Sequence, residues 1–91
     1  MPISVKKLSN DVFEMTIADT STTTHLVTIS DQSLTKLTNN IVTKAQLLDF
    51  SSNFLLERET NTSILSSFDI SDISKYFPDY EGEVRRWCDE V

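Results

Sequence analysis

The chain of 91 residues is poor in the residue types that break secondary structure or form cross-links. Glycine occurs once and proline twice, so no glycine-rich loop is present to cradle a phosphate. One cysteine cannot form an intramolecular disulfide, which excludes the disulfide-stapled secreted scaffolds. No apolar run approaches the roughly 18 residues that a membrane-spanning helix needs. The first residues also lack the apolar segment of a secretory signal, and we therefore expect a reduced, cytoplasmic setting.

Basic residues are scarce as well, with eight Lys and Arg against fourteen Asp and Glu and a formal net charge of −6. The charges of residues 1–45 cancel, so the whole excess lies in residues 46–91. Nucleic acids and anionic lipids are bound mainly through Lys and Arg, and we expect this chain to bind neither nucleic acid nor a membrane. The acidity either keeps surface helices in solution or meets the basic patch of a protein partner.

The first third of the chain has the pattern of a β-sheet. Residues 11–18 alternate, and their inward positions are Phe13, Met15 and Ile17. Residues 22–30 are rich in β-branched side chains, and a polar loop of hairpin length separates the two segments. Residues 3–8 are a further candidate strand. We expect a small antiparallel sheet of two or three strands covered by a helix, because two strands alone are marginally stable.

Helical patterns follow. The main helix is predicted at about 43–58, where Thr43 and Gln46 form a capping box. Its apolar residues share one broad stripe, which we expect to face the sheet: Leu47, Leu48, Phe50, Phe54, Leu55 and Leu56. A short helix is expected after Ser30, ending at Asn39 and Asn40.

Short helical segments are predicted for the C-terminal part of the chain. We expect a helical turn or short helix in 63–68, a short helix from 71 that Pro78 stops, and a last helix over about 79–88. The fold class is therefore α+β, and residues 1–91 are expected to form a single domain, since a chain of this length buries one modest core.

His25 is the only histidine, and Cys88 is the only cysteine. A catalytic pair of the two would need a fold that brings them together, and nothing in the sequence indicates this. We interpret His25 as a structural residue, hydrogen-bonded at the sheet edge or between sheet and helix, and Cys88 as an inert thiol. A small-ligand module or enzyme using His25 stays an alternative.

The acidic residues lack the spacing of a calcium loop, and no metal site, cofactor site or catalytic set is predicted. Arg58 follows Phe54 by one helical turn, so its stem is expected to lie along the apolar stripe, with a carboxylate of Asp69 or Asp72 near its head group. Four aromatic residues lie within twelve positions of the C-terminal half, near arginines, a pattern typical of contact surfaces and equally of a small core onto which the last helices pack. Our candidates for partner binding are Arg58, Tyr76, Tyr80, Arg85, Arg86 and Trp87.

A hairpin with a Thr-x-His-x-Val run at 23–27 precedes Phe-Leu-Leu-Glu-Arg-Glu at 54–59, Ser-Ile-Leu at 63–65 and the segment 68–78. This order resembles a family of short, uncharacterised bacterial proteins, over about residues 11–84. Relatives often have proline after Glu-Arg-Glu, where this chain has Thr60. The resemblance implies a bacterial, cytoplasmic, single-domain α+β protein, and it implies no activity or catalytic residue.

We therefore expect a non-enzymatic interaction or regulatory protein that presents its acidic, aromatic-bearing C-terminal half to a protein partner. A homodimer formed through an open sheet edge, with residues 3–8 as the free strand, is the second alternative.

Overall fold

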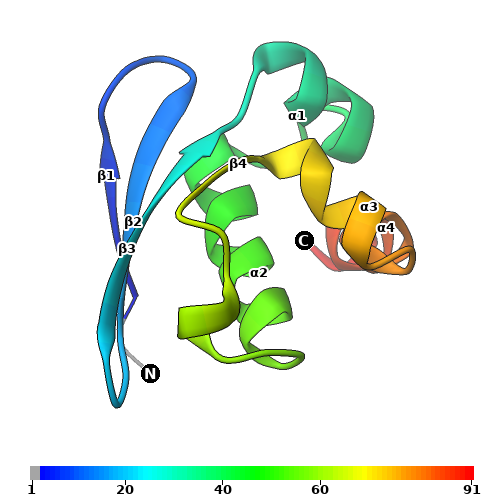
Figure 1. Cartoon of the computed structure of the whole chain (residues 1–91). Coiled ribbons are helices and arrows are strands. Elements are labelled where there is room, and N and C mark those ends of the chain that lie inside the picture. The colour runs from blue at the N-terminus through cyan, green and yellow to red at the C-terminus, as the bar shows by residue number, and fades with distance from the viewer. Residues whose placement is uncertain (1–2) are drawn as a thin grey trace.

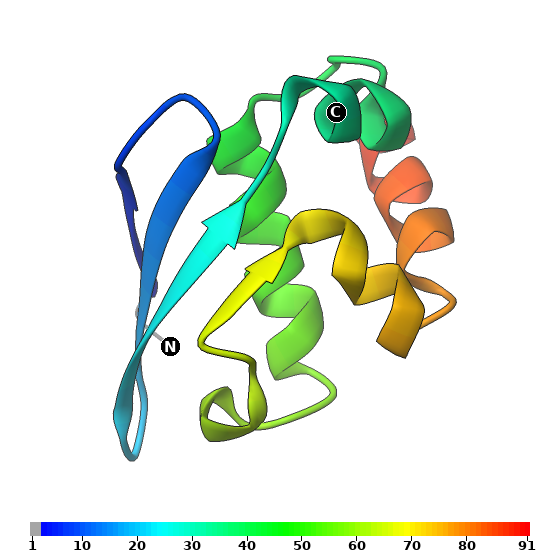
Figure 2. The ribbon, with the colours of Figure 1, turned by 45° about the horizontal axis from the view of Figure 1, so that its top comes forward.

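One four-stranded sheet organises the protein, whose computed structural model describes residues 3–91. Strands β1 (Ile3–Lys7), β2 (Val12–Ala18) and β3 (Thr22–Thr28) form an antiparallel meander. The fourth strand, β4 (Ser67–Asp69), lies parallel to β3 and forms the sheet edge opposite β1 (Figure 2). The order is β1-β2-β3-β4, so the sheet is mixed.

The fourth strand corrects two expectations, the helical turn or short helix in 63–68 and the purely antiparallel sheet of two or three strands. Residues Asn61–Ser63 do form a single 3-10 turn, but Phe68 lies in β4 and pairs with Val27. A strand of three residues is too short to show an alternating pattern. Its partner is distant in sequence, so only the folded chain reveals it.

Four α-helices lie on one side of the sheet (Figure 1). They are α1 (Asp31–Thr38), α2 (Lys44–Leu56), α3 (Ile73–Tyr76) and α4 (Tyr80–Glu90). The capping box predicted for the main helix is confirmed, because Thr43 and Gln46 each accept a hydrogen bond from the other residue's backbone N–H at the start of α2. Helix α1 ends as expected, since Asn39 and Asn40 both have positive φ, at 54° and 61°.

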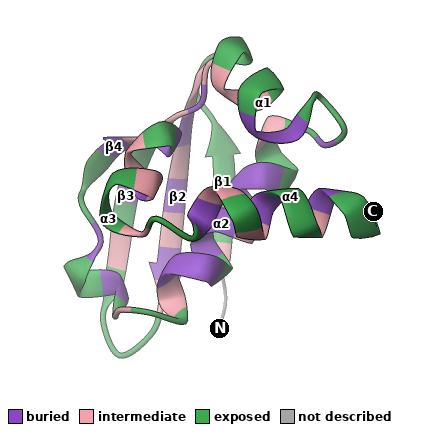
Figure 3. Cartoon of the chain, turned by 90° about the vertical axis from the view of Figure 1, so that its right-hand side faces the viewer, coloured by how far each residue is buried: buried purple, intermediate pink, exposed green. Residues whose placement is uncertain are grey.

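The hydrophobic core lies between the sheet and the helices, where Figure 3 shows the buried residues. The alternation predicted for β2 is confirmed, because Phe13, Met15 and Ile17 are all buried. Helix α2 contributes Leu47, Leu48, Phe54 and Leu55 from the predicted stripe. All these residues belong to one cluster, and the protein is thus a small α+β fold with a single core.

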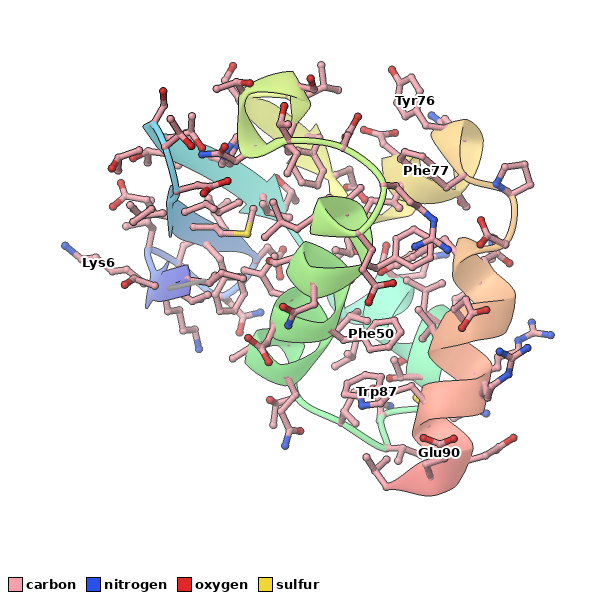
Figure 4. All side chains as sticks on the ribbon, turned by 90° about the horizontal axis from the view of Figure 1, so that it is seen from below. Lys6, Phe50, Tyr76, Phe77, Trp87 and Glu90 are labelled. Atoms are coloured by element: carbon pink, nitrogen blue, oxygen red, sulfur yellow. The ribbon has the colours of Figure 1, made fainter. Side chains whose placement is uncertain are left out.

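The other side of the sheet carries no covering helix from residues 3–91 (Figure 1). Strand β1 pairs only with β2, so its outer edge is open, and its residues from Ser4 to Lys7 are exposed. Lys6 points away from the body of the protein (Figure 4). Lysines on an edge strand discourage pairing with another strand. None of the helices described in residues 3–91 is long and apolar enough to cross a membrane.

Candidate functional site

A groove between α2 and α4 brings together aromatic and acidic side chains. Phe50 of α2 and Trp87 of α4 stack with 4.5 Å between ring centroids and 16° between ring planes (Figure 4). Both rings are only partly buried. The groove encloses about 440 Å³, and the residues around the stack include Asp49, Glu57, Arg58 and Glu83. We call this site the α2–α4 groove.

Arg58 forms one end of the α2–α4 groove. Its guanidinium carbon lies 3.6 Å from the centre of the Phe54 ring, so the head group itself lies on a ring of the apolar stripe, where the sequence predicted contact through the stem. Its Nη2 donates to Asp79 at 2.7 Å, and its Nη1 lies 3.7 Å from a carboxylate oxygen of Glu57. The positive charge of Arg58 is thus met by carboxylates of the protein itself.

The prediction that Asp69 or Asp72 places a carboxylate beside Arg58 is wrong. Asp69 and Asp72 are instead hydrogen-bonded within their own segment. The backbone N–H of Asp69 donates to the carboxylate of Asp72 at 3.1 Å. Lys75 donates to the other oxygen of Asp72 at 3.0 Å. The pKa of Asp72 is lowered by the hydrogen bond from Lys75 and by the backbone N–H of Asp69. These two acids therefore cap the segment before α3, and Asp79 takes their expected role.

The α2–α4 groove keeps an excess of negative charge. Glu83 pairs with Arg86 at 3.1 Å, and Arg58 is neutralised by Asp79. Among residues 3–91, Asp49 makes no ion pair through its carboxylate, and Glu57 makes only the long contact with Arg58. A cation entering the groove would meet carboxylates beside an aromatic stack, the combination that favours guanidinium groups.

Tyr80 does not belong to this surface, and its proposed role in partner binding is corrected. Its side chain is 0% exposed, its ring meets Phe54 edge-on at 5.1 Å, and its hydroxyl is hydrogen-bonded to Ser51 of α2. Burial raises the pKa of the Tyr80 phenol far above its usual value, and the hydrogen bond with Ser51 opposes this only in part. Tyr80 is a core residue that joins α4 to α2.

The other residues predicted to bind a partner do not form one surface. Trp87 lines the α2–α4 groove, whereas Tyr76, which is 66% exposed, lies at the far end of the same view (Figure 4). Arg85 and Arg86 are exposed on α4. The predicted set therefore contains Trp87 and Arg58 in one groove, and Tyr76 at a separate surface.

His25 has the structural surroundings that the sequence indicated. It is 2% exposed, its Nδ1 lies 2.8 Å from the carbonyl oxygen of Leu65, and its Nε2 lies 2.8 Å from the hydroxyl of Thr23. Both ring nitrogens are engaged, so neither is directed at Cys88. The Cys88 thiol is buried in α4, and its pKa is raised by burial and by the charge of Asp89. A raised pKa disfavours the thiolate that nucleophilic chemistry requires.

Within residues 3–91, no group of three or more His, Cys, Asp and Glu side chains is arranged to hold a metal ion. Sequence reasoning placed Phe50 on the core-facing stripe and gave no role to Asp49 or Glu83. Their shared groove depends on how α4 crosses α2, for which the sequence carries no local signal. The chain matches no protein-family model, no curated protein and no solved structure.

Proposed function

We propose that the protein is a non-enzymatic binding module whose α2–α4 groove holds an arginine-bearing segment of a partner protein. The observation that carries this proposal is the partly exposed Phe50–Trp87 stack at the edge of an acidic hollow. Aromatic side chains with a surrounding polar rim are typical of protein contact surfaces.

The groove suits arginine better than lysine for a geometric reason. A guanidinium is planar, so it can lie over an aromatic ring while its N–H groups donate to carboxylates in the same plane. Arg58 already makes this arrangement inside the protein, with its head group over Phe54 and donating to Asp79. Trp87, Asp49 and Glu57 offer the same chemical groups to an arginine from outside.

Trp87 is the only tryptophan, so its fluorescence reports directly on the groove. We would titrate the protein with an oligo-arginine peptide, an oligo-lysine peptide and an oligo-glutamate peptide of equal length. The expected result is a saturable change in Trp87 emission that is tightest with oligo-arginine, weakens as salt rises and is missing with oligo-glutamate. Equal responses to all three peptides, or no saturable response, would contradict the proposal.

Matched variants separate the groove from net charge alone. Glu57→Gln and Asp49→Asn should each weaken oligo-arginine binding about two- to fivefold, as expected for partly exposed ion pairs. Glu14→Gln removes the same charge from β2, on the other side of the core, and should leave the affinity unchanged. If Glu14→Gln weakens binding as much as the groove variants do, the binding is non-specific and the groove is not the site.

A homodimer through the open edge of β1 is the second candidate function. Strand order leaves the outer backbone of β1 without a partner strand among the described residues. Lys6 and Lys7 lie on that strand, and lysines on an edge strand discourage pairing with a second copy, which weighs against this dimer. Light scattering that shows a dimer would support this alternative, and a monomer across the accessible concentration range would exclude it.

A further inference from the structure

A second hollow, separate from the α2–α4 groove, lies between the end of α2, the loop before β4 and α3. It encloses about 380 Å³. Its floor is apolar and consists of side chains that are all buried: Leu55, Ile64, Phe68 and Ile73. Hollows of this size with an apolar lining and a few polar groups are typical of small-molecule sites. We call it the α3 hollow.

The walls of the α3 hollow carry apolar side chains at the solvent boundary. Leu65 is 50% exposed and Tyr76 is 66% exposed, and both line the hollow together with the partly buried Phe77. Figure 4 shows Tyr76 at the end of α3 and Phe77 directly after it. Exposed apolar side chains that gather around a cavity are costly to solvate, so their presence points to an occupant that covers them.

Hydrogen bonds from the sheet hold one wall in place. The carbonyl of Leu65 accepts from Nδ1 of His25 at 2.8 Å, and the carbonyl of Ser66 accepts from the backbone N–H of Leu26 at 2.9 Å. The loop therefore cannot move onto the hollow without breaking the partly buried hydrogen bond to His25. A site that is formed before binding loses little entropy when its ligand enters.

The rim of the α3 hollow is negative. Two carboxylates, those of Glu59 and Asp72, line it, and no Lys or Arg side chain does. Both oxygens of Asp72 already accept hydrogen bonds, from Lys75 and from the backbone of Asp69. Glu59 is a residue of intermediate burial, and its carboxylate reaches solvent and makes no ion pair or hydrogen bond within residues 3–91. Glu59 is thus the free charge of this site.

We propose that the α3 hollow binds a small apolar organic cation, an alkyl or aryl amine, with its ammonium group at Glu59. The apolar body of the ligand would lie on Leu55, Phe68 and Ile73 and be flanked by Leu65 and Tyr76. A neutral ligand would form no ion pair with Glu59, and an anion would be repelled by its unpaired carboxylate. This inference does not depend on the function proposed for the α2–α4 groove.

Three probes that share a phenylbutyl body and differ in the head group test the proposal: 4-phenylbutylamine (cationic), 4-phenylbutanol (neutral) and 5-phenylpentanoate (anionic). Each is titrated into the ¹⁵N-labelled protein while amide chemical shifts are followed by NMR. We expect the amine to shift the amides of residues 59–65 and 72–77 with a Kd on the order of 1 mM, as suits a ligand of this size. The alcohol should bind about five- to tenfold more weakly, and the carboxylate should not bind.

Variants of residues that line the rim of the α3 hollow complete the test. Glu59→Gln should bring the amine down to the affinity of the alcohol, and Tyr76→Ser should weaken both ligands. Glu14→Gln, on β2 and outside the lining of both hollows, should change neither. The proposal is overturned if the amine shifts no resonance in 59–65 or 72–77, if the three probes bind equally, or if Glu59→Gln keeps the preference for the amine.

Discussion

The Nδ1 atom of His25 lies 2.8 Å from the backbone carbonyl oxygen of Leu65, 40 residues along the chain. A carbonyl can only accept, so the ring must carry its proton at Nδ1. The hydroxyl of Thr23 then donates to Nε2, and the oxygen of Thr23 accepts from the side-chain amide of Asn61 at 2.9 Å. This chain of bonds ties β3 to the loop that forms a wall of the α3 hollow.

The proton position on His25 is a direct prediction of this geometry. At neutral to mildly alkaline pH, we expect the Nδ1–H tautomer to dominate, although the Nε2–H form is the more common one in free histidine. Long-range ¹H–¹⁵N NMR correlations of the imidazole ring distinguish the two. A ring protonated at Nε2 alone would mean that the contact with Leu65 is not a hydrogen bond.

Removal of the His25 imidazole ring should destabilise the fold strongly. His25→Ala leaves the Leu65 carbonyl and the Thr23 hydroxyl without their partners and opens a buried cavity. We expect the free energy of unfolding to fall by about 2–4 kcal/mol, as measured in urea. Thr24→Ala, at the exposed neighbouring position, is the control and should cost less than about 1 kcal/mol. Equal losses in the two variants would argue against the network.

Tyr80 should make the protein sensitive to alkali. Its pKa is raised in the folded state, so its contribution to stability is complete below the usual phenol pKa of about 10. Above that pH the unfolded chain loses the proton while the folded protein keeps it, and the free energy of unfolding falls by up to about 1.4 kcal/mol per pH unit. Urea unfolding at several alkaline pH values measures this decline.

Two tyrosine-to-phenylalanine variants test whether Tyr80 causes the fall in unfolding free energy at alkaline pH. Tyr80→Phe should cost about 1 kcal/mol near neutral pH through the lost bond to Ser51, and its deficit against the wild type should shrink as the pH rises above about 10. Tyr76→Phe removes an exposed tyrosine and should leave the decline in place. A deficit of Tyr80→Phe that stays constant with pH would contradict the burial of its hydroxyl.

Lys44 links the start of α2 to two preceding segments. Its ammonium lies 2.9 Å from Asp11 and 2.7 Å from Asp31, and its hydrogen bond and charge lower the pKa of the Asp31 carboxyl. A lowered pKa contributes stability above the usual carboxyl range that is lost as pH falls through the folded-state value. Lys44→Met should return the Asp31 pKa toward its ordinary value in an NMR titration. Lys36→Met, on exposed α1, is the control and should not.

Gly82 offers a stabilising substitution. It lies within α4, and a Cβ atom added there would meet no atom within 4 Å. Gly82→Ala should therefore raise the free energy of unfolding by about 0.5–1 kcal/mol, because alanine loses less backbone entropy in a helix. For a domain of this size, thermal unfolding should shift upward by about 2–8 °C. A destabilised variant would show that the residue is not in a regular helix.

Local patterns predicted the elements that are long enough to display them. The alternation in β2 identified its inward residues, and the Thr43 capping box located the start of α2. The edge position expected for the segment at 3–8 is matched by β1 at the end of the strand order. Periodicity and capping act within a few residues, so one sequence is enough to read them.

Contacts between distant segments decided the rest. Tyr80 has the same helical spacing to Trp87 that a surface pair would have, yet α2 covers Tyr80 and leaves Trp87 partly open. Arg58 pairs with Asp79 because α3 turns the chain back toward the end of α2, while Asp69 and Asp72 are used in capping.

The sequence by itself determined the α+β class, the inward faces of the long strands and the main helix, and the acidic charge of the second half. Only the tertiary structure decided that β4 joins β3, that Tyr80 is core, and that two hollows flank the end of α2. The physical reason is that the periodicity of apolar residues depends on residues close together in sequence. Which strands pair and which helices pack together depends instead on contacts between segments that are distant in sequence.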